Sequence, residues 1–185
     1  VSGGRVWFES DSFGRIDLAS ATDHEIIMIR RYEMNYCSQF LQVIPRVTAL
    51  DVVAEPLVFN GTDSIIARKR AAELLEELAL PKELWNAFPA TFSGGEQQRI
   101  NVARAIIHPP RLLLIDEPTA SLDPMTRETV IRLIKRIREK GTAVILISHD
   151  PMTHRGLSDR RLRLQDGNAS PDESPLEAPQ TKGIT

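Results

Sequence analysis

Two adjacent carboxylates follow a short run of apolar residues in the second half of the chain. Residues 112–115 read Leu-Leu-Leu-Ile, and Asp116 and Glu117 come directly after them. An unbroken apolar run suits a parallel strand that is covered on both faces, and ligands of open α/β sheets bind beyond the carboxyl ends of the strands. An aspartate there can hold Mg²⁺, and a neighbouring glutamate can polarise an attacking water. The alternative is a strand that ends in two solvated acids before a turn.

A histidine follows a second apolar run. Residues 143–148 read Ala-Val-Ile-Leu-Ile-Ser, and His149 comes next. If the two strands are parallel neighbours, His149 lies on the same edge of the sheet as Glu117. An imidazole there can hydrogen-bond a γ-phosphate and help to fix a water. The other three histidines receive only a structural interpretation.

A serine and two glycines open a helical pattern in the middle of the chain, at Ser93, Gly94 and Gly95, and Glu96 and Gln97 follow. The N-terminus of a helix presents free N–H groups and the positive end of the helix dipole. Glycines let backbone N–H groups approach an anion closely, and the serine adds a hydroxyl donor. The stretch therefore predicts a phosphate site, with a loose turn before an ordinary surface helix as the alternative.

Two further polar segments stand at the ends of predicted elements. Gln39 follows a strand-like segment, where its amide could ligate Mg²⁺ and sense a γ-phosphate, or could be a polar loop residue. Ser121, Leu122 and Asp123 lie between the two acids and a long helical pattern. Because Pro124 follows, the simplest reading of Asp123 is an N-cap.

The elements that position these residues alternate between strands and helices in the second half of the chain. A strand at 111–116, a helix from Asp123 to Lys140 and a strand at 143–148 predict a parallel α/β sheet with right-handed crossovers. The middle of the chain is almost all helical, with a helix at 48–58 that we expect to be interrupted at Pro56. The predicted organisation has four parts, namely a partial α/β core at 1–41, a helical subdomain at 42–107, a second piece of the α/β core at 108–165, and a disordered tail at 166–185.

Composition excludes several classes of protein. The 185 residues carry a net charge of −2, so no overall basic field recruits nucleic acid. The single cysteine, Cys37, cannot form an internal disulfide, which fits a reducing compartment. The apolar runs are too short to span a bilayer, and no signal-peptide pattern is visible. We therefore expect a cytoplasmic location.

Taken together, the motifs resemble those of the ABC ATPase family. The matches are Gln39 to the Q-loop, Ser93–Gln97 to the signature motif, Leu112–Asp116 to the Walker B strand with Glu117 as its catalytic glutamate, Ser121–Asp123 to the D-loop and His149 to the switch histidine. They occur in the order of the family and cover about residues 1–165. The resemblance implies an α/β P-loop NTPase fold with a parallel sheet and a helical subdomain.

The same resemblance implies ATP and Mg²⁺ as cofactors. Asp116 and Gln39 would hold the metal, Glu117 would orient water, and His149 would contact the γ-phosphate. In this family two ATP molecules lie between two ATPase subunits, in a homodimer or a heterodimer. The signature residues, Ser93 to Gln97, would then act on the nucleotide of the partner subunit, and Asp123 would help to join the two sites.

Within the family, three segments are similar to the PhnL type, the ATP-binding proteins of the bacterial carbon–phosphorus lyase system: Ser38–Arg46, Leu84-Trp85 and Pro89–Ser93. This similarity implies a role in phosphonate metabolism, in the synthesis of ribose 1-methylphosphonate 5-triphosphate, with soluble lyase-complex proteins as partners. One alternative is the ATPase of a membrane transporter, partnered by a transmembrane subunit. Another is a non-catalytic half-site module that binds a partner. Nucleic-acid binding is disfavoured by the charge.

One family element does not occur in this sequence. The P-loop pattern, G-x-x-x-x-G-K-[ST], is absent, and the chain contains no Gly-Lys pair. The normal place of the P-loop is one strand and one helix before Ser2-Gly3-Gly4. Since the P-loop supplies most contacts to the β- and γ-phosphates, we expect an N-terminally truncated ATPase that is inactive alone.

Overall fold

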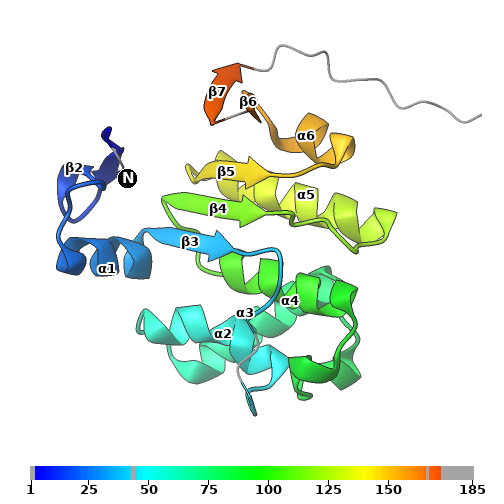
Figure 1. Ribbon diagram of the computed structural model, residues 1–185. Helices are drawn as coiled ribbons and strands as arrows, with labels where there is room; N and C mark the ends of the chain where they lie inside the picture. The colour runs from blue at the N-terminus through cyan, green and yellow to red at the C-terminus, as the bar shows by residue number, and fades with distance from the viewer. Residues whose placement is uncertain (1–2, 43–44, 166, 172–185) are drawn as a thin grey trace, which may run out of the picture.

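A three-stranded parallel sheet forms the centre of the molecule (Figure 1), for which the computed structural model describes residues 3–42, 45–165 and 167–171. Its strands, in spatial order, are β3 (Met34–Cys37), β4 (Leu112–Asp116) and β5 (Ala143–Ile147). Leu112 of β4 pairs with Met34 on one side and with Ala143 on the other, and both pairings are parallel. The predicted parallel sheet is therefore confirmed.

Helices fill the connections between these strands. Between β3 and β4 the chain forms α2 (Ala49–Phe59), α3 (Ser64–Glu77), the short 3₁₀ turns η1 (Lys82–Leu84) and η2 (Pro89–Thr91), and α4 (Gly94–Ile106). Between β4 and β5 it forms α5 (Pro124–Glu139). The interruption predicted at Pro56 is wrong, because α2 runs through it unbroken. Proline removes the N–H that would bond the carbonyl four residues earlier, and its ring crowds that carbonyl, but the buried side chains of Val52, Val53 and Leu57 hold the helix against the core.

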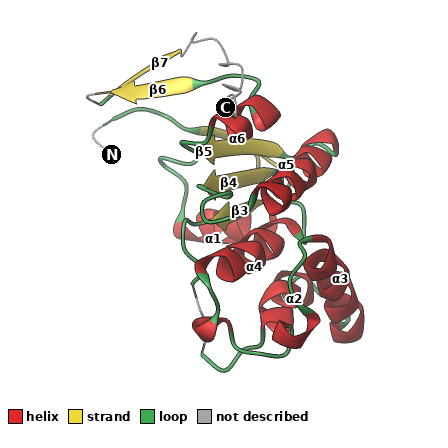
Figure 2. Ribbon diagram, turned by 90° about the vertical axis from the view of Figure 1, so that its right-hand side faces the viewer, coloured by secondary structure: helices red, strands yellow, loops and turns green. Residues whose placement is uncertain are grey.

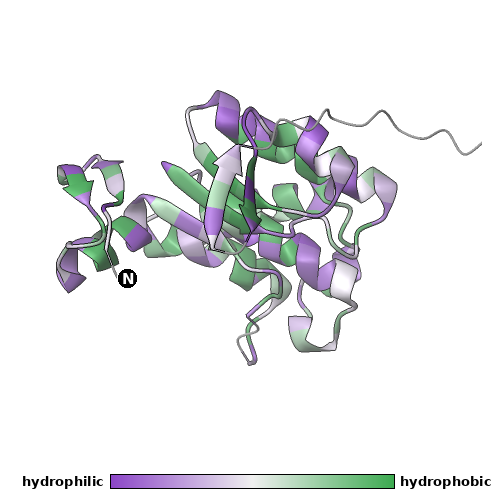
Figure 3. Cartoon of the chain, turned by 45° about the horizontal axis from the view of Figure 1, so that its top comes forward, coloured by the Kyte–Doolittle hydropathy of each residue, from purple (hydrophilic) through white to green (hydrophobic). Residues whose placement is uncertain are grey.

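Helices α4 and α5 cover one face of the sheet (Figure 2), where Leu113 and Ile115 are buried in the core. The opposite face is open in the described part of the chain, and we call it the open face. Its residues include Tyr36, Leu112, Leu114, Ile145 and Ile147, and three of these are largely exposed: Tyr36 by 62%, Ile145 by 58% and Ile147 by 57%. Strands β4 and β5 are strongly apolar (Figure 3). The prediction that they are covered on both faces is wrong for the described residues, because both crossovers place their helices on the same side.

A hairpin and a helix precede the sheet. Strands β1 (Trp7–Ser10) and β2 (Gly14–Asp17) pair antiparallel, and α1 (Asp23–Tyr32) starts at a capping box between Thr22 and Glu25. The buried Glu33 joins the hairpin to the start of β3, since its carboxylate accepts hydrogen bonds from the Ser10 hydroxyl at 2.7 Å and from the Asp11 amide at 2.8 Å.

Three short elements follow β5. They are α6 (Pro151–Leu157) and an antiparallel pair, β6 (Leu162–Gln165) and β7 (Asn168–Pro171). The prediction of a disordered tail from residue 166 is therefore wrong for β7, while the rest of that tail, at 172–185, lies outside the described residues. Gly167 has a φ of 78°, in the left-handed region that a tight reversal between two strands uses. No helix among the described residues is long and apolar enough to cross a membrane.

Candidate functional site

The carboxyl end of β4 carries the two predicted acidic residues. Asp116 is the last residue of the strand and is half-buried, next to Ile147 of β5 in the register. The pairing of Cys37 with Ile115 places the ends of β3 and β4 side by side, and burial, and then the nearby Asp116 carboxylate, raise the pKa of the Cys37 thiol to about 12. Glu117 leaves the strand with a φ of 50°, and its N–H donates to the Ile147 carbonyl at 2.9 Å.

The predicted neighbourhood of Glu117 and His149 is present. The backbone N–H of His149 donates to Oε1 of Glu117 at 2.8 Å, and Nε2 of the imidazole lies 3.7 Å from the same oxygen. The Ser148 hydroxyl donates to Oε2 at 3.4 Å. The Glu117 side chain is only 14% exposed, whereas that of His149 is 95% exposed. The carboxylate is thus held in place, while the imidazole is free to meet a ligand in front of it.

Gln39 lies at the same edge of the sheet, two residues beyond the end of β3, with its side chain exposed. The loop that carries it is fixed through Ser38, whose carbonyl accepts from Nδ2 of Asn101 at 2.6 Å and whose hydroxyl donates to the Phe40 carbonyl at 2.7 Å. The fold therefore brings Gln39, Asp116, Glu117 and His149 to one edge, at the ends of three adjacent parallel strands.

The N-terminus of α4 differs from the bare helix end that the sequence suggested. Ser93 is the N-cap of a capping box, in which its N–H and its hydroxyl both donate to Oε2 of Glu96 at 2.8 Å. The hydroxyl and then the N–H of Ser93 hold the pKa of Glu96 below its usual value. In this state the serine hydroxyl is engaged within the chain. Gln97 points elsewhere, since its amide donates to the carbonyls of Pro89 and Phe92.

The second glycine of this helix makes a close approach to the turn after β4. A Cβ placed on Gly95 would lie 2.8 Å from the backbone oxygen of Ser121, and one on Gly94 would lie 3.9 Å from the Ser121 hydroxyl. Ser121 itself has a φ of 64°. The segment matched to the D-loop therefore packs against the start of α4 in the same chain, and only a glycine fits at position 95 without a shift of backbone.

Asp123 is the N-cap of α5. This is the simpler of the two interpretations of Asp123, the other being a D-loop residue that joins two nucleotide sites. Its carboxylate accepts from the Thr126 N–H at 3.0 Å and from the Thr126 hydroxyl at 2.6 Å. The hydroxyl and then the N–H of Thr126 hold the pKa of Asp123 below its usual value.

A network that the sequence did not predict lies between the turn after β4 and α6. The hydroxyls of Thr119 and Thr153 are both buried and lie 2.9 Å apart, and that of Thr153 also donates to Asp150 at 2.6 Å. Asp150 caps α6, the helix that follows His149. The Asp150-Pro151 pair was the available signal, since Asp123-Pro124 marks the start of α5 in the same way.

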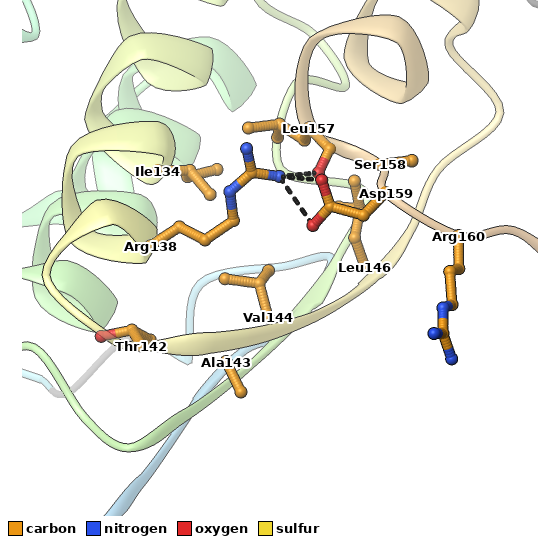
Figure 4. Close-up of a pocket in the computed structure, with 10 residues that line it drawn as sticks. All are labelled: Ile134, Arg138, Thr142, Ala143, Val144, Leu146, Leu157, Ser158, Asp159 and Arg160. Carbon is orange, nitrogen blue, oxygen red and sulfur yellow. Dashed lines mark hydrogen bonds and ion pairs between the residues drawn. The ribbon is translucent and has the colours of Figure 1, made fainter.

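One hollow lies away from this edge, and Figure 4 shows the residues that line it. It has a volume of about 400 Å³ and lies against β5, with Ile134, Val144 and Leu146 among its apolar walls. Arg138 closes one side, where it donates to the Leu157 carbonyl at 2.7 Å and pairs with Asp159 at 3.2 Å. None of the predicted site residues lines this hollow.

These features define a class of protein. A parallel sheet with an Asp-Glu pair after one strand and a histidine after its neighbour, and with a helical region inserted before the acidic strand, is the architecture of a P-loop nucleoside triphosphatase of the ABC type. The family profile described as "ABC transporter" matches residues 3–120. The chain belongs to the ABC transporter family.

Its relatives include ATP-binding proteins of several transporters. The chain is similar to the lipoprotein-releasing system ATP-binding protein LolD of Hyphomonas neptunium, with 39% identity over 82% of this chain and 66% of the relative. It is also similar to the macrolide export ATP-binding/permease protein MacB of Syntrophobacter fumaroxidans, with 35% identity over 84% of this chain and 22% of the relative. The chain thus spans about two thirds of the length of the LolD protein.

Solved structures have the same fold. A dimeric post-hydrolysis state of the ATP-binding cassette MJ0796, bound to ADP and Pi, superposes with a TM-score of 0.79 at 34% identity, over 91% of this chain and 72% of that one. A second dimeric structure of MJ0796 gives a TM-score of 0.80 at 33% identity, over the same shares of the two chains. The P-loop NTPase fold expected from the motifs is therefore confirmed, whereas the specific resemblance to PhnL finds no support among these relatives.

Proposed function

We propose that this chain is the larger part of an ATP-hydrolysing subunit of a membrane ABC transporter. The observation that carries the proposal is the contact between Glu117 and His149 at the carboxyl edge of the sheet, where the His149 N–H holds the carboxylate at 2.8 Å. A largely covered carboxylate beside an exposed imidazole suits a group that orients water next to a group that meets the γ-phosphate.

Asp116 and Gln39 would hold Mg²⁺ at this edge. Both offer hard oxygen ligands, which Mg²⁺ prefers, and Mg²⁺ in nucleotide sites is bound by only one or two protein groups besides phosphates and waters. One carboxylate and one amide oxygen leave the other ligand positions to phosphates and waters, so this donor set fits a metal that arrives with the nucleotide. The ion would neutralise charge on the β- and γ-phosphates.

The start of α4 would act on the nucleotide of a second ATPase subunit. The dimeric MJ0796 structures support this arrangement for a related cassette. Gly94 and Gly95 would offer backbone N–H groups to the phosphate, with Glu96 and Gln97 behind them in the first turn. The Ser93 hydroxyl can join only if it leaves Glu96, so phosphate binding would open the capping box. Asp123 would keep α5 and the turn before it in place at the same interface.

The relatives favour a transporter over phosphonate metabolism. The LolD and MacB proteins are named for lipoprotein release and macrolide export, so the expected partner is a transmembrane subunit rather than a soluble lyase complex. Affinity purification of the complete protein from its own cells distinguishes the two. Recovery with a membrane-embedded subunit supports the transporter role, and recovery with soluble lyase-complex proteins would overturn it.

The hydrolytic role is tested by completing the nucleotide site. A P-loop segment from a LolD relative is fused in front of Val1, and ATP turnover is measured with Mg²⁺ present. Because Glu117 acts on the attacking water, we expect Glu117→Gln to lower turnover by roughly 10²–10⁴-fold, whereas Glu128→Gln on the exposed surface of α5 leaves it unchanged. Equal turnover in Glu117→Gln and in the unsubstituted fusion would remove Glu117 from the reaction. A fusion that binds ATP without hydrolysing it would instead favour the non-catalytic half-site module.

A further inference from the structure

Helix α4 contacts three functional segments with residues of its N-terminal half. Gly95 packs against the Ser121 carbonyl, as described above. One turn later, Nε2 of Gln98 donates to the backbone oxygen of Glu117 at 3.1 Å. Three residues further, Nδ2 of Asn101 donates to the backbone oxygen of Ser38 at 2.6 Å, next to Gln39. Residues three apart lie on one face of a helix, so a single face of α4 reaches both loops.

Both amide side chains are buried, which makes their hydrogen bonds necessary. Gln98 is 4% exposed and Asn101 is 5% exposed. Their neighbours on α4, Ile100 and Ala103, are fully buried aliphatic residues. A polar group in such a place is tolerated only when it is hydrogen-bonded. The amides therefore require the carbonyls of Glu117 and Ser38 at fixed positions.

Glu117 needs such support because its backbone conformation is unfavourable. Its φ of 50° lies in the left-handed region, which a residue with a Cβ adopts only when its surroundings enforce it. Its N–H is bonded to Ile147, and its carbonyl accepts from Gln98 and, at 3.3 Å, from the N–H of Ala120. This conformation directs the side chain to the His149 N–H.

We propose that Gln98 and Asn101 are positioning residues: Gln98 holds Glu117 in its strained turn against His149, and Asn101 holds the loop that carries Gln39. The proposal rests on the proposed function, since it assigns these two amides to the residues that would orient water and bind Mg²⁺. Helix α4 would then have two roles: its first residues would face the partner's nucleotide, and Gln98 and Asn101 would set the geometry of the chain's own site.

The Gln98 part is tested on the 185-residue chain by NMR, without nucleotide. Methionine keeps the length of glutamine and removes the donor, so Gln98→Met should release the Glu117 carbonyl. We expect the amide hydrogen of His149 to exchange about tenfold faster, equivalent to about 1.4 kcal/mol, and its proton resonance to move upfield as the bond to the carboxylate weakens. Exchange at Leu114, inside β4, should not change.

The neighbouring glutamine provides a matched control. Gln97→Met is the same change one residue earlier on α4, but the amide of Gln97 is bonded to Pro89 and Phe92. We expect it to leave the His149 amide unaltered. Asn101→Leu, a near-isosteric change, should shift the Ser38 carbonyl carbon resonance, which is read through the Gln39 amide. It should not affect His149, just as Gln98→Met should not affect Ser38.

Three results would overturn the proposal. One is a His149 amide whose exchange rate is unchanged in Gln98→Met. Another is a His149 amide that exchanges faster in Gln97→Met by as much as in Gln98→Met. The third is loss of the native spectrum in both Gln98→Met and a second variant, Gln98→Leu, which would make Gln98 a residue of overall stability rather than of local position. Because these measurements require no ATP, their failure leaves the proposed hydrolytic role of Glu117 standing, and failure of the turnover experiment leaves the positioning contacts standing.

Discussion

The two glycines at the start of α4 should respond in opposite ways to the same substitution. A methyl group at Gly95 would lie 2.8 Å from the backbone oxygen of Ser121, closer than real Cβ contacts, whereas one at Gly94 would meet the Ser121 hydroxyl at an ordinary 3.9 Å. Overpacking against backbone costs roughly 1–3 kcal/mol. The higher helix propensity of alanine offsets at most about 1 kcal/mol of this loss in the free energy of unfolding.

We therefore expect Gly95→Ala to lower the free energy of unfolding by about 1–2 kcal/mol and Gly94→Ala to raise it by up to about 1 kcal/mol. Urea titrations of the two variants, followed by circular dichroism, measure the difference directly. In a chain of this size each kcal/mol corresponds to a change of roughly 2–4 °C in melting temperature, so thermal melts provide a second measurement.

A third variant separates the close contact from other effects of the extra methyl group. Ser121 is held at a φ of 64°, and glycine at this position has a wider range of φ and ψ, so Ser121→Gly lets the turn shift away from α4 at a lower cost. Gly95→Ala should therefore be less destabilising in the Ser121→Gly background. If Gly95→Ala instead stabilises the chain as Gly94→Ala does, the close approach is absent in solution and the reasoning fails.

The buried hydrogen bonds carry two further predictions. Burial alone would raise the pKa of Glu33, but hydrogen bonds from Ser10, Asp11 and Ser12 hold that pKa below its usual 4.5. The stability that the Glu33 carboxylate contributes is therefore complete above about pH 4.5 and is lost as the pH falls through the lowered pKa. In urea titrations at a series of pH values, Glu33→Gln should make the free energy of unfolding depend less on pH in this acidic range. Thr119→Val and Thr153→Val should each destabilise by about 1 kcal/mol, and a double-mutant cycle should show coupling, because their hydroxyls bond each other. Strict additivity would show that the bond does not form.

The arrangement of the sheet was predictable because its signals are local. Unbroken aliphatic runs mark β4 and β5, and the Asp-Pro pair at Asp123 marks the start of the helix between them. The continuity of α2 through Pro56 was not predictable in the same way, because it depends on burial of Val52, Val53 and Leu57 in tertiary contacts. The strand β7 was missed because composition does not register a reversal at a single glycine, Gly167.

The candidate site was predictable as a set of residue types and only partly as geometry. Parallel pairing of two strands was enough to bring Glu117 and His149 together. The engagement of Ser93 by Glu96 could not be separated from a phosphate site in advance, since a capping box and a phosphate site share the same residues at a helix start. The roles of Gln98 and Asn101 are not predictable from the sequence, because a polar residue on a helix is usually solvated and only the fold shows that both are buried.

The free side of β5 has a consequence for anyone who prepares this chain. Among the described residues β5 pairs only with β4, so it is an edge strand of the described sheet, and it carries the exposed Ile145 and Ile147. Such an edge can recruit the same edge of another copy, and concentrated solutions are then prone to fibre-like association. Lysine at position 145 or 147 is the gentlest protection, because both side chains already lie in solvent and a charge there discourages a second strand.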